Sequence, residues 1–138
     1  MQGRDLSNHL RAGTTPEDDC ALLAAYCTFG NWPWIAAKLA PTPLYAAREY
    51  RGVRTKRYTY VEDLNGPWLL YDNEADPCQL RNLIDDPAHA ALQKKLAALL
   101  LRRREALGDD FLSGKEYIRQ WGYQTDERGT IPCPGWKG

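Results

Sequence analysis

Four cysteines are the most reactive side chains of the sequence. Cys20, Cys27, Cys78 and Cys133 lie far apart, and no two have the C-x-x-C spacing of a structural zinc site. With only two histidines and no G-x-S-x-G motif, the chain has little support for a nucleophilic hydrolase mechanism. Two disulfides are possible by count, but their state stays open, and the polar start without an export signal favours free thiols.

Three pairs of aspartates could provide oxygen ligands for a hard cation. They are Asp18-Asp19, Asp85-Asp86 and Asp109-Asp110. A calcium ion takes about six to eight converging oxygens, and no apolar strand precedes any of these pairs. We therefore expect solvated carboxylates in turns and at a helix cap, and no metal site.

Tryptophans and arginines form the candidate ligand-binding set. Aromatic rings stack on sugar faces, and guanidinium groups pair with sulfate or carboxylate. The alternative, which we favour, is that these residues pack on the sheet or contact another domain. The set comprises Trp32, Trp34, Arg48, Arg51 and Arg54. A separate run, residues 102–104 (RRR), could contact phosphate or an acidic glycan, but it is more typical of a solvated helix face.

Length and charge restrict the class of protein. The 138 residues suit one domain, and 18 basic residues balance 18 acidic ones. A neutral chain lacks the surplus positive charge of a general nucleic-acid binder, so we expect no nucleic-acid partner. No apolar run approaches the ~18 residues of a membrane span. We expect no membrane association and a cytoplasmic chain as given.

Three short β-prone segments and one apolar run predict an antiparallel sheet. Residues 48–55 and 57–62 flank a tight turn, and the second run alternates with period two. Asn65-Gly66 is a hairpin signal before residues 68–71, which are apolar on both faces and are expected to be an interior strand. Residues 20–27 are predicted to add a fourth strand.

A long helix is predicted over residues 87–107. Asp86 is a good N-cap, Pro87 suits the first helical position, and Gly108 suits the C′ position. The expected fold class is α+β, in which a small antiparallel sheet of about four strands packs against this helix. The expected organisation is a lead-in loop at residues 1–19, this subdomain at residues 20–107, and an irregular tail at residues 108–138 with a possible short helix at 115–121.

Three sequence elements resemble the C-terminal subdomain of sulfatases of the alkaline phosphatase superfamily. Residues 70–83, LYDNEADPCQLRNL, resemble L-Y-D-L-x-x-D-P-x-E-x-x-N-L, and Asp86-Pro87 then opens the helix. Residues 50–60, YRGVRTKRYTY, are similar to a hairpin with R-T-x-x-Y-K-Y, and residues 3–7 are similar to a G-x-S-L element. This sequence departs at Asp5, Thr59, Gln79 and the tail.

The residues of this motif suggest chain geometry and no catalysis. Short carboxylates and amides satisfy backbone groups in turns, and proline fixes a turn. The predicted structural residues are Tyr71, Asp72, Asp76, Pro77, Asn82, Asp86 and Pro87.

The resemblance also implies chemistry that these residues do not supply. Sulfatases use a formylglycine made from cysteine in C-x-P-x-R together with a divalent cation, usually calcium, and none of the four cysteines lies in that motif. We therefore expect no cofactor in this chain and no activity from it alone. The expected role is a structural, substrate-lining part of a sulfuric ester hydrolase whose catalytic N-terminal domain is absent here.

Two rival functions and two kinds of partner remain open at this point. The chain could be a stand-alone module that binds anionic glycans through the Trp/Arg set, or a binder of nucleic acid or an acidic partner through residues 102–104. Without the catalytic domain, apolar surface that would pack on it is exposed, and such surface usually binds a partner. We therefore expect either the missing catalytic domain as the partner or self-association, such as a dimer. Related enzymes can be exported, and their substrates are not determined by this sequence.

Overall fold

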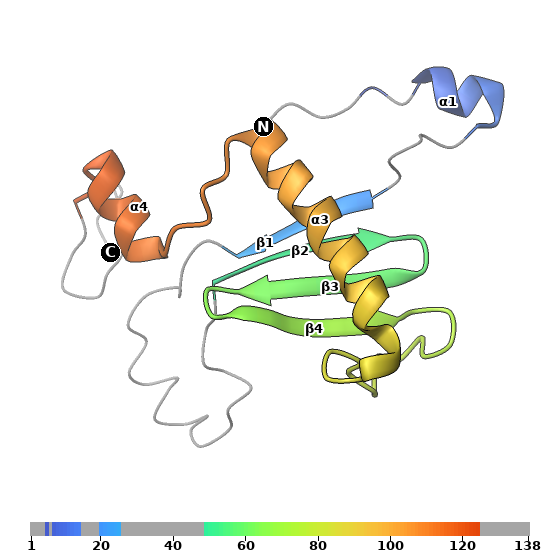
Figure 1. Cartoon of the computed structure of the whole chain (residues 1–138). Helices are drawn as coiled ribbons and strands as arrows, with labels where there is room; N and C mark the ends of the chain where they lie inside the picture. The colour runs from blue at the N-terminus through green and yellow to red at the C-terminus, as the bar shows by residue number, and fades with distance from the viewer. Residues whose placement is uncertain (1–4, 6, 15–19, 26–48, 125–138) are drawn as a thin grey trace, which may run out of the picture.

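The computed structural model describes residues 5, 7–14, 20–25 and 49–124 of the chain. Within these residues, four strands form one antiparallel meander: β1 (Cys20–Ala25), β2 (Tyr50–Thr55), β3 (Tyr58–Asp63) and β4 (Gly66–Asp72). The strands lie in sequence order, so every neighbour in the chain is a neighbour in the sheet (Figure 1). The predicted α+β fold with a four-stranded sheet is confirmed.

One long helix covers one face of the sheet. A 3₁₀ turn, η2 (Pro87–His89), leads into α3 (Ala90–Leu107), which crosses over β2 and β3 (Figure 1). Asp86 caps this start by accepting a hydrogen bond from Ala88 N at 3.0 Å. Gly108 ends the helix in the left-handed conformation, at φ 63°. The predicted cap, first proline and C′ glycine are thus confirmed.

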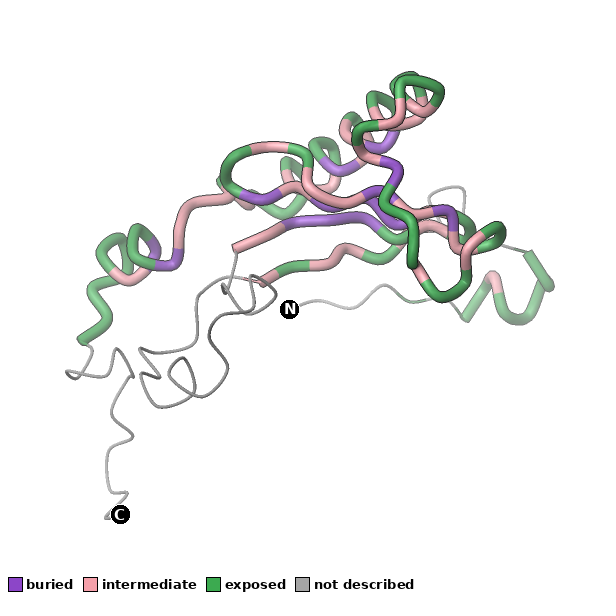
Figure 2. Tube along the Cα trace, turned by 90° about the horizontal axis from the view of Figure 1, so that it is seen from below, coloured by how far each residue is buried: buried purple, intermediate pink, exposed green. Residues whose placement is uncertain are grey.

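The core lies between α3 and the sheet. Cross-strand pairing aligns one apolar row on the helix-facing side, and α3 places leucines against it. The buried strip is visible where the tube of Figure 2 is purple in the sheet and along one side of the helix. The row is Leu22, Val53, Tyr60 and Leu70, and the helix contributes Leu96 and Leu100, with Leu92 and Leu99 partly buried beside them.

The position of β4 corrects the sequence analysis. Its apolar residues on both faces predicted an interior strand, but β4 is an edge strand of the sheet. A side chain and a backbone amide from the following loop satisfy its outer edge. Asn82 Oδ1 accepts from Leu70 N at 2.9 Å, Asn82 Nδ2 donates to Trp68 O at 3.0 Å, and Leu83 N donates to Leu70 O at 2.8 Å. The loop therefore replaces a fifth strand.

Two short helices lie outside the sheet-and-helix core. The segment expected to be a lead-in loop contains α1 (Ser7–Ala12), because Asp5 accepts from Ser7 N at 2.9 Å at its start and Gly13 ends it at φ 62°. In the tail, the possible short helix is α4 (Gly114–Trp121), which starts one residue before the predicted range. Ser113 and Glu116 form a complete capping box at its start. No helix in the described residues is long and apolar enough to span a membrane.

Candidate functional site

The predicted Trp/Arg ligand set is only partly placed by the structure. Trp32, Trp34 and Arg48 lie outside the described residues. Arg54 is exposed on β2. Arg51 is completely buried, so its guanidinium group is not available to a ligand in this conformation. As a set, the proposed sugar-binding residues stay a prediction.

Arg51 instead forms a buried ion pair with Asp109, 58 residues later in the chain. Arg51 Nε donates to Asp109 Oδ2, and Nη2 donates to Oδ1 at 3.2 Å. The Arg51 side chain is 0% exposed and that of Asp109 is 7% exposed. Arg51 Nη1 also donates to Ala25 O at 3.0 Å and to Tyr50 O at 2.9 Å. One guanidinium group thus joins the end of β1, the start of β2 and the segment that follows α3.

An aromatic ring completes this cluster. The guanidinium carbons of Arg51 and Arg104 lie 4.8 Å and 5.0 Å from the centre of the Phe111 ring, which are cation–π distances. Tyr117 on α4 donates its hydroxyl to Asp109 Oδ1 at 3.0 Å. We call Arg51, Arg104, Asp109, Phe111 and Tyr117 the tail cluster. It attaches the segment after α3 to the end of the sheet.

The charge state of the tail cluster is set by its hydrogen bonds. Burial by itself would raise the pKa of Asp109, but bonds from Arg51, Phe111 N and Tyr117 outweigh it and lower that pKa. Asp109 is therefore ionised when the cluster is formed. The expectation that Asp109 and Asp110 are equivalent solvated carboxylates is wrong for Asp109, because the fold buries it against an arginine. Asp110 is exposed.

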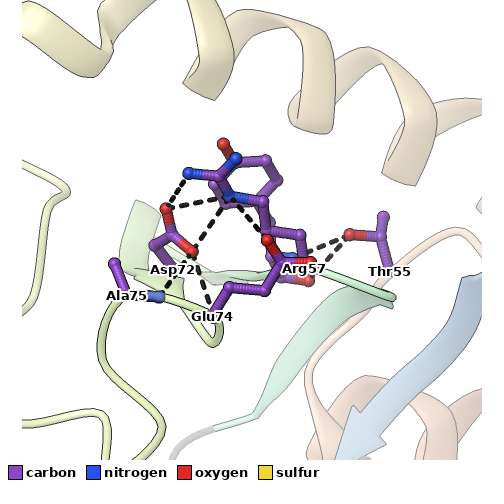
Figure 3. A network of polar contacts seen from close by, with 6 residues as sticks. Thr55, Arg57, Asp72, Glu74 and Ala75 are labelled. Atoms are coloured by element: carbon purple, nitrogen blue, oxygen red, sulfur yellow. Dashed lines mark hydrogen bonds and ion pairs between the residues drawn. The ribbon is translucent and has the colours of Figure 1, made fainter.

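The turn after β4 is built on Asp72, whose carboxylate was predicted to bond backbone N–H groups there. Its carboxylate accepts from Glu74 N at 3.1 Å and Ala75 N at 3.2 Å, and Arg57 Nη2 donates to Oδ2 at 2.7 Å (Figure 3). Arg57 lies in the turn before β3, where Thr55 Oγ1 accepts from Tyr58 N at 2.8 Å. The two turns at this end of the sheet are therefore held together. Sequence reasoning missed Arg57 as the partner of Asp72.

Asp72 makes the stability of the fold sensitive to acid. The hydrogen bond from Arg57 is the main cause that lowers the pKa of Asp72 to about 2. Because this pKa lies below the unfolded value of about 3.9, the stabilisation is complete above that value and is lost as the pH falls towards 2. We expect the free energy of unfolding to fall over this window. Urea unfolding at several pH values should show a shallower fall in Asp72→Asn than in Asp85→Asn, which removes an exposed carboxylate.

Equal slopes in the two variants would contradict this role of Asp72.

Two further motif residues, Asp76 and Asn82, also bond the backbone. Asp76 Oδ2 accepts from Arg81 N at 2.8 Å, and Asn82 completes the edge of β4 as described above. Pro77 lies in the turn between them, and Tyr71 is half-buried at the end of β4, opposite Thr59 of β3. The motif is thus a set of turn and edge contacts.

Two of the departures named above, Thr59 and Gln79, meet in one polar cluster with Asn73. Thr59 stands where the pattern has lysine, Gln79 where it has glutamate, and Asn73 where it has leucine. Gln79 Nε2 donates to Asn73 Oδ1 at 2.7 Å, Asn73 Nδ2 donates to Thr59 Oγ1 at 3.0 Å, and Gln79 Nε2 lies 3.4 Å from Thr59 Oγ1. A neutral network therefore occupies the place where the family pattern would put a lysine near a glutamate. The paired departures were the signal from which sequence reasoning could have found this contact.

A double-mutant cycle tests this coupling. Thr59→Lys alone places a cation at a buried position without an anion, and Gln79→Glu alone places a carboxylate at the half-buried neighbouring position without a cation. Together they restore opposite charges, so we expect the double variant to be more stable than the sum of the single effects predicts. The expected coupling is about 1 kcal/mol or more, within the usual range for contacting residues. Chemical denaturation of all four proteins measures it.

Strict additivity of the two substitutions would show that the two positions do not interact.

The remaining sequence candidates are placed as follows. Cys20 and Cys78 are free thiols, whereas Cys27, Cys133 and Asp18-Asp19 lie outside the described residues. Each of the three arginines at the end of α3 has a different environment. Arg102 is exposed, Arg103 Nε donates to Cys20 Sγ at 3.2 Å, and Arg104 faces Phe111.

No group of three or more metal-ligating side chains gathers in the described part of the chain. Asp72, Asp86 and Asp109 each accept hydrogen bonds from nitrogen donors, in a turn, at a helix cap and in a buried ion pair respectively.

Comparison with known proteins gives the same class as the motif and the fold. The family described as "N-sulphoglucosamine sulphohydrolase, C-terminal" matches residues 41–106. The ulvan-active sulfatase of Formosa agariphila is 33% identical over 124 residues, which are 89% of this chain and 22% of that protein. The chain is therefore similar to the C-terminal part of a sulfatase, and the resemblance inferred from its motifs is confirmed.

Solved structures agree at the level of the fold. A protein of Bacteroides fragilis assigned to the sulfatases superposes with a TM-score of 0.56 at 24% identity, covering 80% of this chain and 21% of that one. A second structure, which holds its substrate D-glucosamine-2-N,6-O-disulfate, superposes with a TM-score of 0.58 at 24% identity, covering 79% and 20%. The chain thus spans about a fifth of the length of the proteins that it matches.

Proposed function

We propose that this chain forms the C-terminal subdomain of a sulfatase and contributes no catalytic group of its own. The observation that carries the proposal is that most of the chain matches about a fifth of the length of the ulvan-active sulfatase and of the two solved structures. The formylglycine and the divalent cation of such an enzyme come from the rest of the protein. The cysteines of this chain lie outside C-x-P-x-R, and its described carboxylates hold turns, a helix cap and an arginine.

The rest of the enzyme is proposed to pack on the sheet face opposite α3, where Gly52 and Val61 are already buried within the chain and Leu23 and Leu69 are half-buried. Strand pairing aligns a second row on this face, and Gly52 in its centre leaves room for the side chain of Val61. In the described residues no helix covers this face, whereas α3 lies wholly on the other one (Figure 2). A sheet with two apolar faces needs a second covering layer. The row consists of Leu23, Gly52, Val61 and Leu69.

The substrate class that we propose for the whole enzyme is a sulfated saccharide. The Formosa agariphila relative is named for its activity on ulvan, and one structural neighbour holds a disulfated glucosamine. The present chain would contribute only lining contacts to such a substrate, through the Trp/Arg set. Because Arg51 is buried in the tail cluster, Arg54 is the one member of that set exposed in the described residues. This leaves the stand-alone glycan-binding alternative without a described pocket.

A chimeric enzyme tests the proposal. The C-terminal region of the Formosa agariphila sulfatase is replaced by this chain, and sulfate release from ulvan is measured. We expect the chimera to release sulfate and this chain alone to release none. Leu69→Asp on the sheet face opposite α3 should abolish the activity of the chimera, whereas Leu64→Asp in the exposed hairpin turn should preserve it. Circular dichroism of the isolated chain with each substitution shows whether either one unfolds it.

Hydrolysis of an aryl sulfate by the isolated chain would contradict the proposal, as would an active Leu69→Asp chimera.

A further inference from the structure

The two edges of the sheet differ in the hydrogen bonds that their outer backbone groups make. The outer edge of β4 is closed by Asn82 and Leu83, which bond Trp68 and Leu70. The strand at the opposite edge of the sheet is β1. In the described residues β1 pairs with β2 on one side and with no strand on the other. No described segment forms a further ladder along β1. Among the described residues, one edge of this sheet is therefore closed by a loop, and the backbone donors and acceptors along the other are paired with no further strand.

The sequence of β1 carries none of the features that keep an edge strand unpaired. Its six residues, CALLAA, include no charge and no proline. It pairs with β2 through six consecutive residues without a bulge, so the edge is regular. Edge strands that stay single usually carry a lysine, a proline or a bulge, because a flat apolar edge accepts another strand.

We propose that β1 pairs antiparallel with β1 of a second copy of this chain. Two copies related by a two-fold axis perpendicular to the sheet would join their four-stranded sheets into one and keep both α3 helices on the same face. A second copy suits this edge because its small apolar side chains complement themselves and bring no like charges together. The chain also has zero formal net charge, so little general repulsion opposes association.

The sheet-edge contact is independent of the proposed sulfatase contact. The first uses the backbone edge of β1, and the second uses the sheet face opposite α3. The oligomeric state of the chain therefore tests the pairing of β1, and the activity of the chimera does not.

Light scattering after size-exclusion chromatography tests the pairing. We expect the full chain to elute at twice its mass of 15.7 kDa. Ala21→Glu should halve the measured mass, because it places a carboxylate from each copy at the proposed contact between the two β1 strands. Ala21 is exposed and lies opposite Arg54 on β2, so the new carboxylate has an arginine beside it within its own sheet. Unchanged circular dichroism verifies that the variant is folded.

A matched control makes the same charge change away from the edge. Ala98→Glu alters an exposed alanine of α3, and we expect it to leave the dimer intact. A monomeric wild-type chain over the accessible concentrations would overturn the inference. So would a folded Ala21→Glu variant that stays dimeric, or an Ala98→Glu variant that dissociates to the same extent.

Discussion

Replacing Asp109 by alanine is expected to lower the free energy of unfolding by about 3–5 kcal/mol. The reason is the partner that remains. Arg51 is 0% exposed, and its guanidinium group would keep its charge without the carboxylate that neutralises it. Tyr117 and Phe111 N would also lose their acceptor, which loosens the attachment of α4. Urea unfolding followed by circular dichroism measures the loss.

Two further variants separate the ion pair from other effects. Asp110→Ala removes the neighbouring carboxylate, which is exposed, and should change stability by less than about 0.5 kcal/mol. The double variant Arg51→Met with Asp109→Leu removes both charges, and it should recover much of the loss because buried pairs can be replaced by apolar residues of similar volume. Equal effects of Asp109→Ala and Asp110→Ala would contradict the buried pair.

Leu100→Ala is expected to destabilise the fold by about 2–5 kcal/mol. Leu100 is 0% exposed at the centre of the core, where it packs with Val53, Tyr60 and Leu70. Truncation removes one methine and two methyl carbons and leaves a cavity between α3 and the sheet, which a rigid sheet cannot fill. Thermal and urea unfolding of the variant measure the effect.

The next residue provides the control. Leu101 is 50% exposed on the same helix, so Leu101→Ala makes the identical chemical change with little loss of burial. We expect a change of less than about 1 kcal/mol for it. If the two leucines had similar effects, α3 would not be seated on the sheet through the side that contains Leu100.

The elements that could be predicted were those defined by local patterns. Alternating side chains in residues 57–62 and the Asn65-Gly66 turn gave the hairpins, because strand periodicity and turn conformation depend on adjacent residues. The cap at Asp86 and the leucine repeat gave η2 and α3 for the same reason. The turn roles of Asp72 and Asp76 could be predicted because their backbone partners lie within five residues, whereas the β4 partners of Asn82 lie 12 and 14 residues earlier.

The errors arose where a sequence pattern has two physical causes. Residues 68–71 are apolar on both faces, which an interior strand requires, but an edge strand can have the same pattern if a loop seals its edge. Asn82 and Leu83 do so here. Similarly, a lead-in loop and the short helix α1 have similar compositions, and local caps at Asp5 and Gly13 decided between them.

The sequence by itself determined the fold class, the order of the elements and the resemblance to a sulfatase C-terminus, because those depend on short-range chemistry and recognisable spacing. Only the tertiary structure decided which charges are buried and paired. Arg51 and Arg54 look alike in sequence, yet β2 directs one into the tail cluster and leaves the other exposed. Asp109 and Asp110 are likewise adjacent, and only the return of the chain after α3 places the first against Arg51. Burial of a charge depends on partners distant in the sequence, and no local pattern records it.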